Sequence, residues 1–208
     1  MKRLLVFLAI VACALTFSVK AISLPEVTDH EKVTVYMFRG SGCGHCYDAL
    51  TFFYQNLGKY SDYIEFKAYE VWQNENNTEL KFDIEKQFNE HDPEHNPVPY
   101  IVVGDSYTLQ GFGASSGNAI IEAALNEYQN PKYKDVVAKT IKDKKYKVTA
   151  ETLEEAATAE GINASTIAKQ DEEQSKEKGK YDALIIVAIF VAVIGGVVAL
   201  MFSNRKND

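Results

Sequence analysis

The stretch VTVYMFRGSGCGHCYDALTFFYQNL, residues 33–57, places a strand pattern, a cysteine pair and a helix pattern in immediate succession. Its first six residues are β-branched, aromatic or otherwise apolar, which predicts a strand over 33–38. From 46 to 57, large apolar side chains recur at spacings of three and four, which predicts a helix. Cys43 and Cys46 therefore stand where a strand gives way to a helix.

Strand and helix patterns continue to alternate downstream. The expected elements are a strand at 63–71, a helix at 79–88, strands at 100–103 and 106–110, and a helix at 115–128. The Gly104-Asp105 turn makes a hairpin of the last two strands, and the helical crossovers before them imply parallel neighbours. The expected fold class is α/β, in the order β-α-β-α-β-β-α.

The CGHC tetrapeptide at 43–46 admits three interpretations. A structural zinc site needs four ligands, usually from two such pairs. Here only the histidines at 30, 91 and 95 remain, and they complete a set only by coincidence of folding. A structural disulfide would close a tiny loop and remove little unfolded-state entropy. The third interpretation is a redox pair, and its position at the start of a helix favours it.

A cysteine at a helix start meets unpaired amide N–H groups and the positive end of the helix dipole, which stabilise a thiolate. We expect Cys43 to be the exposed, attacking thiolate. Cys46, one turn inside the helix, is expected to be the buried resolving thiol that releases the product. His45, when protonated, adds positive charge that favours the Cys43 thiolate. A stabilised thiolate makes the disulfide a better oxidant.

The succession strand, CGHC, helix, with Val98-Pro99 before a later strand, resembles the thioredoxin superfamily over about residues 31–130. The CGHC tetrapeptide is that of protein disulfide isomerase catalytic domains. The start at 33–38, with no extra strand and helix before it, is similar to the minimal fold of glutaredoxins. The segments GSGCGHC and VPYIVVGD resemble bacterial membrane-tethered thioredoxin-like proteins.

The resemblance implies a thioredoxin-like domain in which the Val98-Pro99 bond is cis and faces the cysteines, while Pro97 is trans. The residues it assigns are the catalytic Cys43, Cys46 and His45, a redox disulfide Cys43–Cys46, and the substrate-contacting Gly42, Gly44, Val98 and Pro99. It implies no cofactor and no metal.

Two positions depart from the family pattern. Met37 stands where thioredoxins carry a buried carboxylate that takes the proton of the resolving thiol. Gly42 stands where a tryptophan usually precedes the first cysteine, so the surface beside Cys43 is expected to be more open. Arg39, close to the motif, is expected at the surface, with charge steering as the alternative. The 91–95 loop, HDPEH, is likewise expected to be solvated rather than a metal site.

Both ends of the chain carry apolar runs. Lys2 and Arg3 precede the run at 4–19, which predicts a signal peptide over 1–21. The alternatives are an uncleaved anchor and a lipoprotein signal at Cys13. The uncharged run at 183–202 is long enough to span a bilayer. We therefore expect a single-pass transmembrane helix at 182–203, a cytoplasmic tail at 204–208 and an extracytoplasmic domain.

Between the expected domain at 22–130 and the apolar run, the composition becomes rich in Lys, Glu and Ala. We interpret 131–181 as a charged, partly helical stalk, including a short helix at 148–159 with Thr149 as its cap. The alternative is a small helical appendage packed on the domain. Its few apolar candidates are Leu153, Ile162 and Ile167.

The composition fits a globular protein, with 46% hydrophobic and 25% charged residues, and the net charge of -7 argues against nucleic-acid binding. The expected function is thiol–disulfide exchange with exported, cysteine-containing proteins. Since no flavin, nicotinamide or quinone motif is present, a redox partner must recharge the pair. The alternative from another class is a redox-inert adaptor or chaperone that holds extended peptides.

Overall fold

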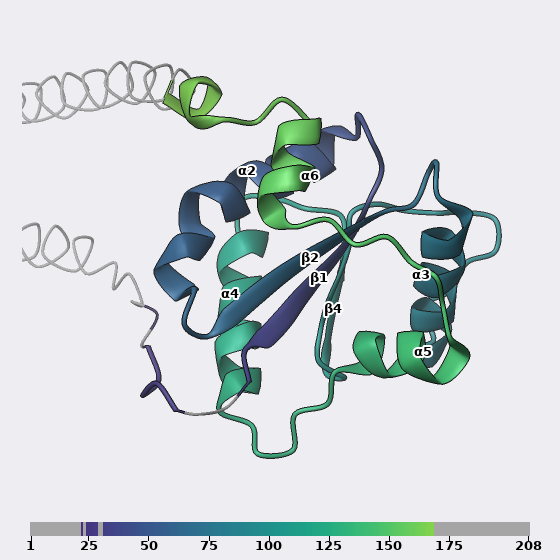
Figure 1. The fold of residues 1–208 in the computed structure, drawn as a ribbon, viewed down its shortest axis with the longest axis horizontal. Coiled ribbons are helices and arrows are strands. Elements are labelled where there is room, and N and C mark those ends of the chain that lie inside the picture. The colour runs from purple at the N-terminus through teal and green to yellow at the C-terminus, as the bar shows by residue number, and fades with distance from the viewer. Residues whose placement is uncertain (1–21, 23, 29–30, 169–208) are drawn as a thin grey trace, which may run out of the picture.

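The computed structural model describes residues 22, 24–28 and 31–168 (Figure 1). Its strands are β1 (Val33–Arg39), β2 (Ile64–Glu70), β3 (Tyr100–Val103) and β4 (Tyr107–Gln110). Its helices are α2 (Gly44–Asn56), the 3-10 turn η1 (Leu57–Tyr60), α3 (Glu75–Gln87), α4 (Ser116–Tyr128), α5 (Val136–Lys144) and α6 (Leu153–Ala159). The predicted α/β class is confirmed, and the predicted order of elements holds from β1 to α4.

The four strands form one mixed sheet in the order β2-β1-β3-β4. β1 and β2 are parallel, as expected for strands joined through a helix, and β3 and β4 form the expected antiparallel hairpin. The expectation of parallel neighbours is wrong for β3, which runs antiparallel to β1 with Phe38 opposite Tyr100. This pairing starts β3 at the end of the sheet where β1 finishes, beside the cysteine motif.

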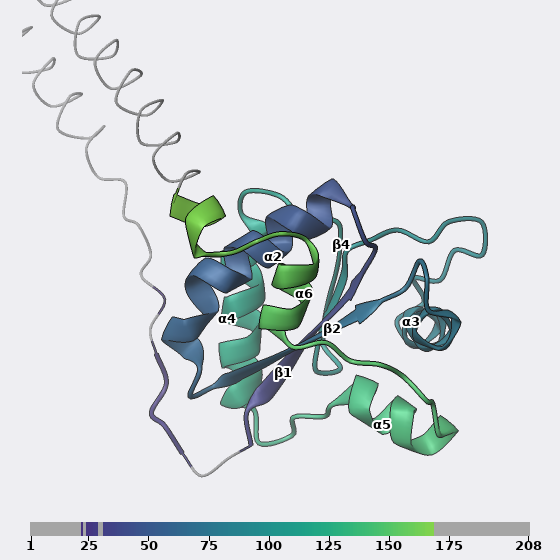
Figure 2. The same ribbon diagram turned by 45° about the horizontal axis from the view of Figure 1, so that its top comes forward.

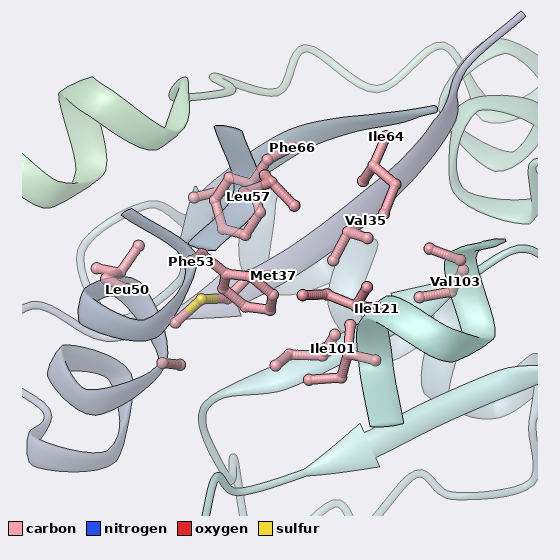
Figure 3. Packing of buried hydrophobic residues seen from close by; sticks show 14 of the residues in the cluster. Val35, Met37, Leu50, Phe53, Leu57, Ile64, Phe66, Ile101, Val103 and Ile121 are labelled. Carbon is pink, nitrogen blue, oxygen red and sulfur yellow. The ribbon is translucent and has the colours of Figure 1, made fainter. Parts of the chain in front are cut away.

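Helices cover both faces of the sheet (Figures 1 and 2). Because side chains alternate along a strand, Val35 and Met37 of β1 join the cluster under α2, α4 and α6, while Tyr36 and Phe38 join the cluster under α3 and α5. Figure 3 shows the first cluster, in which Met37 and Phe53 lie among branched aliphatic side chains. The motif at 43–46 thus lies at the start of α2, a helix that packs on this buried cluster.

The segment that follows α4 is not a solvated stalk up to residue 168. α5 and α6 pack on the domain. Four apolar side chains in or next to these helices are buried: Val137, Ala156, Ala157 and Ile162. Ala68 of β2 and Glu151 exchange backbone hydrogen bonds of 2.8 Å in both directions. The packing of this part of the chain agrees with the appendage interpretation, and packed residues continue past position 130.

The apolar candidates of this appendage contact the domain as proposed. Ile162 is buried, and Leu153 and Ile167 are partly buried against the cluster under α2. The helix is shorter than expected, because its N-cap is Thr152 and not Thr149. Thr152 and Glu155 form a capping box, in which each side chain accepts the other's backbone N–H.

Removing the appendage should destabilise the domain. We expect a chain ending at residue 130 to unfold at lower urea concentration than one ending at 168, because it exposes apolar surface and strips Arg39 of both its carboxylate partners. Urea titrations of the two chains, followed by circular dichroism, measure the difference. Equal midpoints with equal slopes would contradict the packing described for α5 and α6.

The predicted signal peptide at 1–21, the rest of the predicted stalk at 169–181, the transmembrane helix at 182–203 and the tail at 204–208 lie outside the described residues. Within residues 22, 24–28 and 31–168, no helix is both long and apolar enough to cross a membrane.

Candidate active site

The cysteine motif begins in a tight turn between β1 and α2. The carbonyl of Gly40 accepts the N–H of Cys43 at 3.2 Å, and Gly42 has a φ of 77°, a conformation that glycine adopts without a Cβ penalty. Cys43 is the N-cap of α2, with extended φ and ψ of -76° and 121°. The sequence thus places the first cysteine at the helix start, as expected.

The two sulfurs occupy different environments. Cys43 is partly exposed, whereas Cys46 is fully buried in the cluster that also contains Met37. The Cys43 sulfur accepts the N–H of Cys46 at 3.3 Å, which satisfies one of the free amides of the helix start. Burial, followed by the hydrogen bond with Cys43, raises the pKa of the Cys46 thiol well above its ordinary value.

A distant segment supplies the other wall of the site. The Val98–Pro99 peptide bond is cis, as expected, and it is the only cis bond among the described residues. The Cys43 thiol lies 3.7 Å from the carbonyl oxygen of Val98, to which it donates. Residues separated by 55 positions in the sequence therefore meet because β3 starts where β1 ends. Pro99 is buried, while Val98 is half-buried against both clusters.

The remaining predicted site residues line an open surface. Gly42, Gly44 and His45 are exposed, and a Cβ built at either glycine would meet nothing within 4 Å. The expectation of an open surface beside Cys43 is confirmed. Within the described part of the chain, no three His, Cys, Asp or Glu side chains gather as a metal site. That includes the 91–95 loop, whose His95 side chain is 71% exposed.

Arg39 is not the surface residue that its sequence context suggested. Only 1% of it is exposed, and its guanidinium donates to Glu151 at 2.8 and 2.9 Å and to Glu160 at 2.7 Å. Burial disfavours the charged form, but the hydrogen bond and charge of Glu151, with the charge of Glu160, raise the net pKa of Arg39 above its ordinary value. The partners lie more than a hundred positions away, so no local signal announces them.

Trp72, which the sequence did not single out, also lies beside the motif. It follows β2, is 53% exposed, and a Cβ built on Gly40 would lie 2.2 Å from its ring. Gly40 is therefore required for this close approach of an indole to the turn. A large, exposed aromatic ring here supplies apolar contact area beside Gly40, at the start of the turn that leads to Cys43.

Only one of the two thiols should react with iodoacetamide at pH 8. Because alkylation requires a thiolate and the raised pKa keeps buried Cys46 protonated at that pH, we expect label on Cys43 alone in the native, reduced protein. Fragment-ion mass spectrometry locates the label, and Cys46 should react only after denaturant is added. Equal labelling of both cysteines in the native protein would contradict the assigned environments.

No protein-family profile, curated protein or solved structure matches this chain.

Proposed function

We propose that the protein is a thiol–disulfide oxidoreductase with a thioredoxin-like domain, in which Cys43 and Cys46 form a reversible redox pair. The observation that carries the proposal is the asymmetry of the two sulfurs. Cys43 is partly exposed at a helix N-cap, where it accepts an amide N–H, and Cys46 is buried one turn further on. The first environment suits an attacking thiolate and the second a thiol that reacts only within the protein.

In the oxidising direction, a substrate thiolate attacks the Cys43 sulfur of the disulfide, and Cys46 leaves as a thiolate. A second substrate thiolate then attacks the substrate sulfur of this mixed disulfide, and Cys43 leaves. Two electrons pass from the substrate to the pair, and the substrate gains one disulfide bond. In the reducing direction the same steps run backwards: Cys43 attacks a substrate disulfide, and Cys46 attacks Cys43 to release the reduced substrate.

The surroundings support binding of an extended polypeptide. Val98 presents its backbone beside the Cys43 sulfur, and the exposed Gly42 and Gly44 leave the approach to that sulfur open. His45, exposed between the cysteines, contributes positive charge when protonated. The buried Met37 supplies no carboxylate for the Cys46 proton, so another group or water has to take it.

The proposed setting is the outer face of a membrane. The sequence patterns at 4–19 and 183–202 support export of the domain and anchoring by one span, with exported cysteine-containing proteins as substrates. A separate redox partner would recharge the pair.

Reduction of insulin by dithiothreitol, followed as turbidity, tests the proposal. The purified full chain in detergent should shorten the lag before insulin precipitates, because Cys43 relays electrons from dithiothreitol to the insulin disulfides. A lag equal to that with dithiothreitol alone, in protein whose cysteines are titratable, would refute disulfide exchange with proteins and favour the redox-inert adaptor.

A further inference from the structure

The carboxylate of Glu160 lies against the turn that presents Cys43. Its two oxygens accept the N–H of Gly42 at 3.1 and 3.3 Å, and one of them also accepts from Arg39 at 2.7 Å. The side chain is only 9% exposed. It thus joins the C-terminal appendage to the residue directly before the first cysteine.

Two features of this placement disfavour a negative charge at Glu160. Glu160 is the C-cap of α6, the helix end where the dipole disfavours a negative charge. Arg39 contributes one positive charge to two carboxylates, Glu151 and Glu160, so the three side chains together carry a net negative charge. Of the two carboxylates, Glu160 is the one that contacts the cysteine turn.

We infer that Glu160 is a positioning residue that sets the redox equilibrium of the cysteine pair: the Gly42 N–H keeps its carboxylate against the turn, and the negative charge opposes the Cys43 thiolate. A carboxylate near this thiolate destabilises the reduced form of the pair. The disulfide is therefore a weaker oxidant than it would be with the stabilising effect of the helix N-terminus alone. The inference rests on the proposed function, since it concerns the regulation of that same pair.

The test is the equilibrium between the full chain and glutathione at pH 8. In this reaction the protein disulfide and two glutathione thiols give the protein dithiol and one glutathione disulfide, a transfer of two electrons and two protons. Glu160→Gln keeps the shape of the side chain and removes its charge. We expect it to raise the equilibrium constant toward the dithiol about three- to tenfold, where tenfold corresponds to about 30 mV.

Three further variants separate charge near the turn from other effects. Glu151→Gln removes the charge of the other carboxylate that binds Arg39, a carboxylate without a contact to the Gly42 N–H. Glu65→Gln removes an exposed charge near the start of β2, at the end of the sheet away from the motif. Each should leave the constant within twofold of the wild type. Glu160→Asp keeps the charge and shortens the side chain, and it should also stay within twofold.

The outcomes are distinct. A shift in Glu160→Gln alone supports the inference. A constant within twofold of wild type in that variant, an equal shift in Glu151→Gln, or an equal shift in Glu160→Asp would each overturn it. The glutathione measurement requires only that Cys43 and Cys46 form their intramolecular disulfide in glutathione buffer, and it needs no protein substrate. A chain that fails the insulin assay but shows the shift would therefore refute the proposed function and leave the role of Glu160 standing.

Discussion

Cys43→Ser should abolish the acceleration of insulin reduction, leaving the rate of dithiothreitol alone. A serine hydroxyl cannot form the mixed disulfide, and Cys46 is too buried to replace Cys43. A residual rate above the dithiothreitol background would contradict the assignment of Cys43 as the attacking thiol.

Cys46→Ala should have the complementary effect. Without the resolving thiol, the mixed disulfide between Cys43 and its substrate persists, because nothing inside the protein attacks it. Non-reducing gels should then show covalent adducts with insulin chains that dithiothreitol removes. The double variant Cys43→Ser, Cys46→Ala is the matched control and should form none. Adducts in the double variant would contradict the scheme.

Arg39→Met should cause a large loss of stability, because Arg39 is a buried cation with two carboxylate partners. It leaves Glu151 and Glu160 without their shared cation, and removing one partner of a buried ion pair costs about 3 kcal/mol or more. Lys67→Met, which breaks an exposed pair with Glu65, is the matched control and should cost below about 1 kcal/mol. Urea denaturation of both variants measures the free energies of unfolding.

A double-mutant cycle sharpens this prediction. Adding Glu160→Gln to Arg39→Met removes the unpaired charge, so part of the lost stability should return. Strictly additive losses would mean that Arg39 and Glu160 are not energetically coupled. The contact between Glu160 and Arg39 would then contribute nothing to the free energy of unfolding.

The sequence predicted the centre of this molecule well because local patterns determine it. The strand at 33–38, the helix after it and the strand at 100–103 are found within one or two residues, and both cysteines lie where the helix pattern put them. The cis bond at Val98–Pro99 was also expected, although from a family resemblance and not from the residues themselves.

What could not be predicted depends on contacts between distant segments. The direction of β3 is a matter of its pairing with β1, a segment far away in the sequence, and no local pattern indicates that this pairing is antiparallel. The burial of Arg39 depends on Glu151 and Glu160, in a segment whose Lys- and Glu-rich composition suggested solvent. The buried residues of α6 are alanines, which carry little hydrophobic signal.

The most direct test of the central claim is a redox titration of the full chain in glutathione buffers, with the Cys43–Cys46 state read by mass after thiol trapping. We predict one reversible two-electron transition, with a midpoint between about -270 and -120 mV, the range of exchanging dithiol pairs. A pair that stays oxidised below about -300 mV, as structural disulfides do, or that never forms an intramolecular disulfide, would contradict it.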